Sequence, residues 1–249
     1  MTASTPGFPT WVDLGTADLQ DAMRFYPALF GWHPHFDGSY TTFFLDGRAV
    51  AGAGPLYGEG QPTAWSTYIA TDDADGVAVR VAAAGGKVLV PPFDVHDQGR
   101  MAAFLDPGGA PFSVWQAGTM PGAAVFDAPG ALTWNELNTR DLDGARAFYG
   151  AVFGWGFRDS AMGGRPYVVA KLNETAICGI QLMAGEEWPA DLIPHWTIHF
   201  AVHDCDRAVA EAVALGGYVI RQPTTLPIGR YAILEDPQGG MFAVLASNR

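Results

Sequence analysis

Three histidines in the second half of the chain are candidates for metal binding or proton transfer, and their spacing discriminates between the two. His195, His199 and His203 stand four residues apart, in or just after a segment whose composition predicts a strand. On a helix, His-x-x-x-His brings two imidazoles to one metal ion. On a strand, four residues span about 13 Å, which is too far for a shared ion. We therefore expect His195 and His199 to share a strand face, and His203 to lie beside Asp204 at the start of the next helix.

His199 is the histidine best placed for general acid or base work, because we expect it to project near Glu136. A neighbouring carboxylate orients an imidazole and raises its pKa for proton transfer. A core histidine that bonds only the backbone is the alternative, and both interpretations stay open.

Two arginines recur at matching points, each directly after a glycine: Arg100 and Arg230. A guanidinium can hold the carboxylate of a ligand through two parallel hydrogen bonds. It can equally form a structural ion pair, for which we expect the acidic turns at Asp106 and Asp236 as partners. The sequence favours neither role over the other.

These residues belong to an internal repeat. WVDLGTADLQDAMRFYPALFGW (11–32) matches WNELNTRDLDGARAFYGAVFGW (134–155), and three later pairs of segments match in the same order, ending with FLDPGGAPFSVWQ (104–116) and LEDPQGGMFAVLA (234–246). We predict module 1 over residues 1–120, a linker rich in Gly, Ala and Pro over 121–130, and module 2 over 131–249.

Each copy predicts the order strand, helix, three strands, twice over. The first helix is expected to begin after Asp18 and end at Gly31, with Leu19, Met23, Tyr26 and Phe30 at helical spacing. A second helix covers 73–84, and the strand 87–90 is expected to stop at Pro91 and Pro92. We assign the aromatic residues of the first helix of each copy to core packing.

The FY…LFGW segments, the DDAD and HDCD helix starts and the DPxG turns resemble the glyoxalase I, bleomycin-resistance and extradiol-dioxygenase superfamily, which has the vicinal-oxygen-chelate fold. Within it, the chain looks most like two-module actinobacterial proteins called culture-filtrate antigens or hydroxylase-like. The resemblance implies an α+β fold of tandem glyoxalase-like modules, each with two βαβββ units that form curled mixed sheets around a concave pocket.

Metal-dependent members of this superfamily place donors on the first strand, on the strand before the second helix and on the last strand. Carried over, these positions fall on Asp13, Ser66 and Ser113 in module 1, and on Glu136, Thr197 and Ala243 in module 2. One strong donor per module is too few for a stable site. We therefore expect no metal and no cofactor. A divalent ion held by Glu136 and His199 is the less favoured alternative.

The resemblance also suggests which side chains line the pocket. Tyr68 and Trp115 share strand parity with Ser66 and Ser113, which favours a flat aromatic ligand. Trp65 and Trp196 have the opposite parity and are expected to pack against helices. The candidate ligand-binding residues are Ser66, Tyr68, Arg100, Ser113, Trp115, Thr197 and Arg230.

The composition restricts the partners. The net charge is −12 with 14 basic residues and no basic cluster, so we expect neither nucleic-acid nor membrane binding. The chain shows no signal-peptide pattern and no apolar run long enough to span a membrane, which predicts a cytoplasmic protein. Its two cysteines, Cys178 and Cys205, are expected to be buried and inert.

The function we expect is metal-independent binding of a small aromatic or amphipathic metabolite, for sequestration or in an accessory role in its metabolism. The alternative is an isomerase, cyclase or lyase that uses Glu136 and His199, or Asp13, as acid and base. A small-molecule ligand is the expected partner, and tandem modules are compatible with a monomer or a homodimer.

Overall fold

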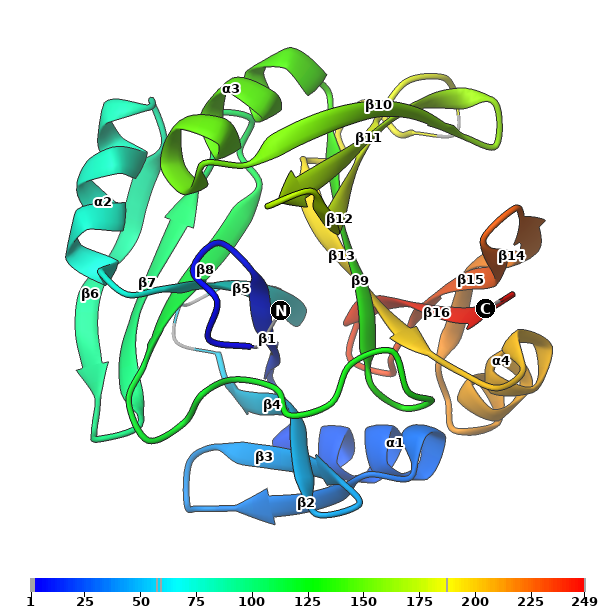
Figure 1. Cartoon of the computed structure of the whole chain (residues 1–249). Helices are drawn as coiled ribbons and strands as arrows, with labels where there is room; N and C mark the ends of the chain where they lie inside the picture. Colours follow the sequence, from blue (N-terminus) through cyan, green and yellow to red (C-terminus); the bar gives the residue numbers. More distant parts are fainter. Residues whose placement is uncertain (1–2, 57, 59, 187, 249) are drawn as a thin grey trace. The chain divides into compact units, whose positions relative to one another are not determined.

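The computed structural model describes residues 3–56, 58, 60–186 and 188–248. Its elements follow the predicted order, strand, helix, three strands, four times over (Figure 1). The first repeat contains β1 (Pro9–Thr16), α1 (Leu19–Phe30), β2 (His33–Phe36), β3 (Thr41–Leu45), β4 (Arg48–Pro55), β5 (Ala64–Thr71), α2 (Ala74–Ala83), β6 (Lys87–Val95), β7 (Gly99–Leu105) and β8 (Pro111–Ala117). The second contains β9 (Leu132–Thr139), α3 (Leu142–Phe153), β10 (Gly156–Met162), β11 (Arg165–Leu172), β12 (Thr175–Leu182), β13 (His195–Ala201), α4 (Cys205–Ala214), β14 (Tyr218–Leu226), β15 (Gly229–Glu235) and β16 (Met241–Ser247).

The strands form two eight-stranded mixed sheets with equivalent orders. The first runs β2-β3-β4-β1-β5-β8-β7-β6 and the second β10-β11-β12-β9-β13-β16-β15-β14. In both, the first strand of a βαβββ unit pairs in parallel with the last, as β1 does with β4 and β13 with β16, and hairpins supply the antiparallel pairs. The predicted α+β class of tandem βαβββ units is confirmed.

Helix ends lie where the capping residues predict them. The Asp18 side chain accepts a hydrogen bond from the backbone N–H of Asp21, and Gly31 ends α1 with a φ of 72°, in the left-handed region. Asp141 and Gly154 cap α3 in the same way. The starts of both helices are thus fixed by local hydrogen bonds.

The predicted end of the strand at Pro91 is wrong. β6 continues through Pro91 and Pro92 to Val95, and its pairing with β7 shifts register between Val90 and Phe93. β6 is the last strand of its sheet, so a residue without an N–H can be accommodated on its unpaired side or at the bulge. The local sequence does not show that β6 lies at the edge of the sheet, and this position is what allows the strand to continue through the prolines.

The chain forms two compact units, each with its own core. Unit 1 contains Met1–Trp11, Thr67–Gly122 and Asn135–Trp196, and unit 2 contains Val12–Ser66, Ala123–Trp134 and Thr197–Arg249. Each unit therefore combines half of one sequence repeat with half of the other. α2 and α3 cover the core of unit 1, and α1 and α4 that of unit 2.

The segment predicted as a linker is packed along most of its length. Val125 is a member of the unit 2 core. The backbone N–H of Ala124 donates to the carbonyl of Ala49 over 2.8 Å, and the Trp32 indole donates to the carbonyl of Gly130 over 2.6 Å. Residues 123–130 thus contribute to the structure of unit 2.

A buried tyrosine anchors the first helix of each repeat. In unit 2, the Tyr26 hydroxyl donates to Oδ2 of Asp236 over 2.7 Å and accepts from the Trp65 indole over 3.0 Å. Burial, followed by the charge of Asp236, raises the pKa of Tyr26 well above its usual value, so the phenol keeps its proton. Trp65 and the aromatic residues of α1 therefore pack in the core, as predicted.

Unit 1 repeats this arrangement with Tyr149, Asp106 and Trp196. The Tyr149 hydroxyl donates to Asp106 over 3.1 Å, and the Trp196 indole donates to that hydroxyl over 3.3 Å. The backbone N–H of Ala110 also donates to the Asp106 carboxylate. Burial raises the pKa of Asp106 and, likewise, of Asp236 in unit 2.

The Tyr149→Phe substitution should therefore destabilise the protein by about 1–3 kcal/mol, because it removes one donor from a buried carboxylate. Urea unfolding measures this cost. The matched control is Tyr218→Phe, at a side chain that is 62% exposed, where we expect no significant change. Equal effects of the two substitutions would contradict a role for the buried hydrogen bond.

Candidate functional site

Except for Arg100 and Arg230, the predicted site residues lie on the strand faces that point away from the helix-covered cores. Arg100 shares strand parity with the core residues Ala102 and Phe104, and Arg230 shares it with Ala232 and Leu234. Neighbours of opposite parity identify the core faces: Val12 and Leu14 flank Asp13, and Ile198 and Phe200 flank His199. In unit 1, Leu137 follows Glu136, Ile69 follows Tyr68, and Phe112 and Val114 flank Ser113. The strands thus separate packing residues from candidate functional residues.

In unit 2, the first-strand carboxylate binds a tyrosine. The Tyr40 hydroxyl donates to Oδ2 of Asp13 over 3.2 Å. Gly52, the register partner of Asp13 on β4, leaves room for this contact, because a Cβ there would lie 1.8 Å from the Tyr40 hydroxyl oxygen. Any larger residue at position 52 would displace the tyrosine.

Unit 1 contains the matching pair. The Tyr167 hydroxyl donates to Oε2 of Glu136 over 2.8 Å, and Gly179 is the register partner of Glu136 on β12. The sequence interpretation missed Tyr40, considered Tyr167 only as an aromatic lining residue, and expected neither to bind a carboxylate. Tyr40 and Gly52 recur 127 positions later as Tyr167 and Gly179, and this shared spacing would have identified them.

His199 is buried, with 7% of its surface exposed, and its Nε2 has no hydrogen-bond partner among the described residues. Burial lowers the pKa of His199 to about 4. This direction is opposite to the one expected from a carboxylate partner, so the imidazole is neutral at pH 7. His203 lies just before the helix-capping Asp204, as predicted.

The remaining positions tested for metal donors are mostly buried. Ser113 and Thr197 are 5% and 3% exposed, Ala243 is fully buried, and Ser66 is half-buried. Within the part of the chain that the structure describes, no group of three or more His, Cys, Asp or Glu residues is placed to hold a metal ion. This donor set does not fit the three or four ligands of a divalent metal site.

Two aromatic side chains expected in the lining are also well packed. Tyr68 is the register partner of Ser113, and both share one strand face. The Trp115 indole donates to the carbonyl of Met120 over 2.8 Å, and a Cβ at Gly99 would lie 2.5 Å from its ring. Tyr68 and Trp115 are each 7% exposed, which fixes their orientation.

Both repeat-matched arginines are engaged in ion pairs. Nε and Nη2 of Arg100 bind the two carboxylate oxygens of Asp75, at 2.9 and 3.0 Å, and Nη1 binds Asp94 at 2.8 Å. Arg230 holds Asp206 in the same two-pronged way, at 2.6 and 2.8 Å.

The partners expected for these arginines, Asp106 and Asp236, were wrong. Those two carboxylates are buried under tyrosines, whereas Asp75 and Asp206 lie in the first turns of α2 and α4. The arginines therefore anchor helix starts, and their guanidinium groups are already occupied by protein carboxylates.

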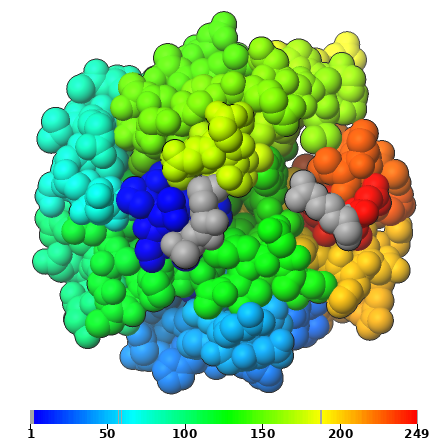
Figure 2. Space-filling view, viewed as in Figure 1, coloured from blue at the N-terminus to red at the C-terminus, as the bar shows by residue number. Residues whose placement is uncertain are grey.

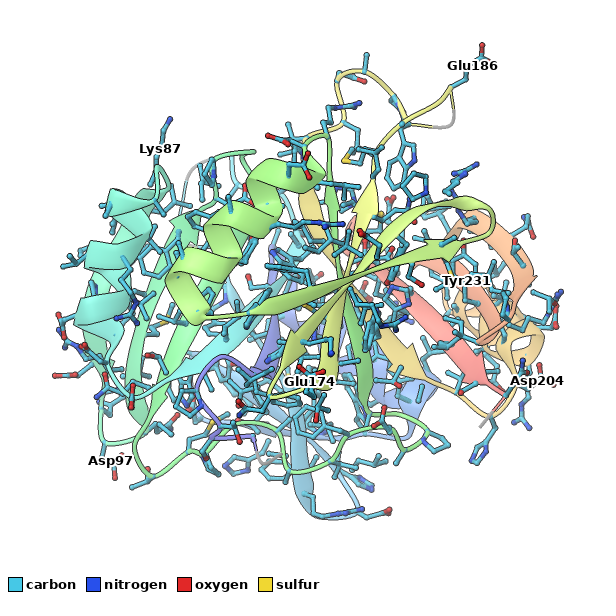
Figure 3. The ribbon with its side chains drawn as sticks, turned by 45° about the horizontal axis from the view of Figure 1, so that its top comes forward. Lys87, Asp97, Glu174, Glu186, Asp204 and Tyr231 are labelled. Atoms are coloured by element: carbon cyan, nitrogen blue, oxygen red, sulfur yellow. The ribbon has the colours of Figure 1, made fainter. Side chains whose placement is uncertain are left out.

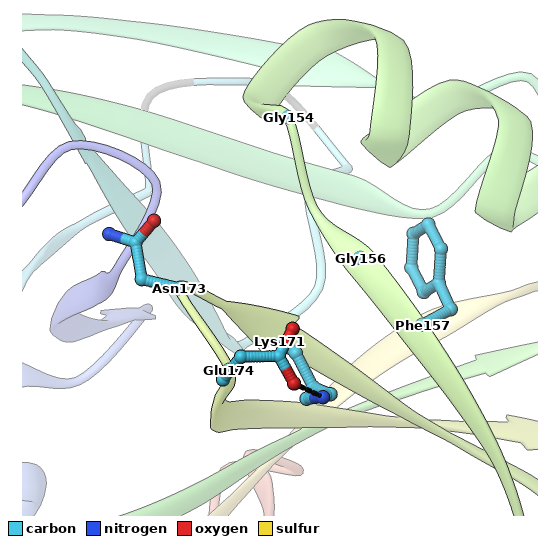
Figure 4. A pocket seen from close by; sticks show the side chains of 6 residues that line it. All are labelled: Gly154, Gly156, Phe157, Lys171, Asn173 and Glu174. Carbon is cyan, nitrogen blue, oxygen red and sulfur yellow. Dashed lines mark hydrogen bonds and ion pairs between the residues drawn. The ribbon is translucent and has the colours of Figure 1, made fainter.

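One described pocket, of about 350 Å³, lies elsewhere in unit 1 (Figure 4). Its lining consists of Gly154, Gly156, Phe157, Lys171, Asn173 and Glu174, and it includes none of the predicted site residues. An ion pair joins Lys171 to Glu174 across the β11–β12 turn. We assign this pocket no function.

The pKa of His199 generates a pH prediction. As the pH falls from 6.5 to about 4, His199 becomes protonated in the unfolded chain but stays neutral in the folded chain. The wild-type free energy of unfolding should therefore fall over this range, relative to His199→Gln, by about 3 kcal/mol at most. Denaturant unfolding at several pH values measures the difference. The control is the exposed His203→Gln, which should follow the wild type. An identical pH dependence for His199→Gln would contradict the prediction.

Comparison with known proteins identifies the family. The model of the glyoxalase/bleomycin resistance protein/dioxygenase superfamily matches residues 9–114 and 131–244. The chain is 41% identical over 264 residues to the anthracycline biosynthesis protein DnrV of Streptomyces peucetius, covering 98% of this chain and 95% of the relative. It is 43% identical over 253 residues to the putative glyoxylase CFP32 of Mycobacterium bovis, covering 96% and 94%.

Solved structures share the fold at low sequence identity. The Mn(II)-bound glyoxalase from Novosphingobium aromaticivorans superposes with a TM-score of 0.66 at 18% identity, covering 97% of this chain and 82% of that one. The 2,3-dioxygenase LapB from Pseudomonas sp. KL28 gives 0.63 at 14%, covering 98% and 94%. No helix in the described residues is both long and apolar enough to span a membrane. The chain belongs to the glyoxalase/bleomycin resistance protein/dioxygenase superfamily, with two tandem modules.

Proposed function

We propose that this protein binds a small aromatic metabolite without a divalent metal and serves in the metabolism or sequestration of that metabolite. One observation carries the proposal. Where metal-dependent members of the superfamily place their first-strand donor, each repeat has a carboxylate that accepts a hydrogen bond from a tyrosine, Asp13 from Tyr40 and Glu136 from Tyr167. The donors needed to complete a metal site are replaced by Ser113 and Ala243 on the last strands.

Two further observations support an aromatic ligand. Tyr68 and Trp115 place aromatic rings, each 7% exposed, on the non-core strand face of unit 1, and aromatic rings favour flat ring partners. The name of the Streptomyces relative places that protein in anthracycline biosynthesis. Because anthracyclines are planar aromatic molecules, an aromatic ligand is the choice that agrees with both the side chains and the relative.

The test is equilibrium dialysis with 1,8-dihydroxyanthraquinone as the probe, before and after exhaustive chelation with EDTA. We expect the Kd to change by less than about twofold, because no ligand contact depends on a metal. Readdition of Mn²⁺ is the control and should leave the Kd unchanged. A tenfold or greater loss of affinity on chelation, recovered with Mn²⁺, would contradict the proposal that binding needs no metal.

A second candidate function is acid–base catalysis by an isomerase, cyclase or lyase. The hydrogen bonds from Tyr40 and Tyr167 favour it, since they hold in place two carboxyl groups of a type that can act as general acid or base. The low pKa of His199 makes this histidine a poor proton donor at neutral pH.

Under this alternative, Glu136→Gln or Asp13→Asn should lower kcat for a converted substrate at least 100-fold while the fold is retained. Steady-state kinetics with circular dichroism on each variant measures both. The exposed Glu211→Gln provides a control that should keep wild-type turnover. Unchanged turnover in both site variants would exclude these carboxylates as the catalytic bases.

A further inference from the structure

Two further histidines lie on one strand at a spacing that suits a shared metal ion. β2 carries His33 and His35, which are two residues apart and therefore project from the same face. Two residues along a strand span about 6.6 Å. Over this distance two imidazoles can turn their ring nitrogens toward one ion, with each nitrogen about 2.0–2.1 Å from the metal. The strand spacing that keeps His195 and His199 apart thus allows His33 and His35 to share an ion.

Both imidazoles are accessible from solvent. All four residues of β2 are exposed, and β2 is the outermost strand of its sheet. Figure 2 shows the segment that contains β2 at the molecular surface, in blue at the bottom of the view. Among the described residues, neither imidazole takes part in a hydrogen bond or an ion pair. No described protein group therefore competes with a metal ion for the ring nitrogens of His33 and His35.

The backbone of β2 holds the two rings close together. The strand pairs with β3, where His33 lies opposite Phe44. The ring centre of His35 lies 6.4 Å from that of Phe44, edge to face, so the ring leans along the strand toward the position of His33. Pro34 lies between the two histidines, opposite the fully buried Phe43, and its own ring restricts its backbone φ to about −65°. The geometry thus favours convergence of the imidazoles before any ion binds.

This pair lies away from the position that holds metal in the metal-dependent members of the superfamily. Asp13, at the first-strand donor position, is the register partner of Gly52 on β4. Gly52 lies opposite Thr42 on β3, and Thr42 lies opposite His35. His35 is therefore three strands from Asp13, about 14 Å at the usual spacing of about 4.8 Å between strands. Because strand side chains stand roughly perpendicular to the sheet, the two histidines form a separate site.

The second repeat shows that this strand forms without histidines. Its equivalent, β10, pairs antiparallel with β11 as β2 does with β3. Gly156 occupies the position of His33 there, and Arg158 occupies that of His35. The fold therefore does not require imidazoles at these positions, and packing does not account for their presence on an exposed edge strand.

We propose that His33 and His35 form a chelating site for a divalent ion of the late first transition series, Zn²⁺, Cu²⁺ or Ni²⁺. Imidazole nitrogens suit these ions, whereas Mg²⁺, Ca²⁺ and Mn²⁺ prefer oxygen donors. The net charge of −12 raises the concentration of cations around the chain. This site is additional to the proposed function, which does not depend on it.

The small number of protein donors determines how such an ion is held. Two imidazoles hold an ion more weakly than the three or four protein ligands of a resident metal centre. The ion therefore exchanges with solvent, and its remaining coordination positions stay open to water or to an external ligand. This behaviour distinguishes the site on β2 from a closed structural metal site.

Isothermal titration calorimetry of the full chain with ZnCl₂, after treatment with EDTA and removal of the chelator, tests the site. We expect one dominant binding event per chain. His33→Gln and His35→Gln should each raise the Kd for Zn²⁺ at least tenfold, because a single imidazole cannot chelate. MnCl₂ should bind the wild type at least tenfold more weakly than ZnCl₂, as the order of affinities for nitrogen donors predicts.

Two controls separate chelation from the mere presence of histidine. His35→Phe combined with Phe36→His keeps the composition but moves one imidazole to the opposite strand face, and it should weaken Zn²⁺ binding as the single variants do. His96→Gln removes an exposed histidine outside β2 and should leave the Kd within about twofold of the wild-type value. Asp97, the residue that follows His96, points outward from the molecule (Figure 3).

Each outcome decides the proposal. Wild-type Zn²⁺ affinity in either single variant, or in the variant with exchanged residues 35 and 36, overturns the two-histidine site, as does absence of Zn²⁺ binding to the wild type. Equal affinity for Mn²⁺ and Zn²⁺ overturns the assignment to nitrogen donors. Circular dichroism and the Tm verify that each variant is folded, which we expect because β2 is exposed. The proposed function stands or falls separately, because its test measures binding of an aromatic probe.

Discussion

The buried tyrosine–aspartate hydrogen bond is the interaction on which the arrangement of this chain depends. Tyr26 in the first repeat bonds Asp236 in the second, and Tyr149 in the second bonds Asp106 in the first. Each pair joins the first helix of one repeat to the last turn of the other within a compact unit. Without the tyrosine, either carboxylate would be buried with backbone donors alone, so residues of both repeats contribute to the stability of each unit.

Under this constraint, the two repeats have similar residues on their core faces and different residues on the opposite faces. The core faces of the two repeats match closely, as the pairs Tyr26 and Tyr149, Trp65 and Trp196, and Phe112 and Phe242 show. The opposite faces retain the carboxylate, its tyrosine and the glycine opposite it, and they differ at other positions, such as Gly15 in the first repeat and Asn138 in the second. Because strand residues alternate between faces, substitutions on the non-core face do not disturb the tyrosine–aspartate anchor. The non-core faces of the two repeats could therefore diverge while their core-facing residues stayed similar.

The features predicted from sequence were those set by local or periodic signals. Asp18 and Gly31 fix the ends of α1 through hydrogen bonds within a few residues, and the repeat gave the element order. The features that were missed depend on distant neighbours. Whether Pro91 ends a strand depends on edge position, and the partner of Arg100 is a helix-capping turn 25 residues away. The tyrosine partners of Asp13 and Glu136 required the register of β1 with β4 and of β9 with β12.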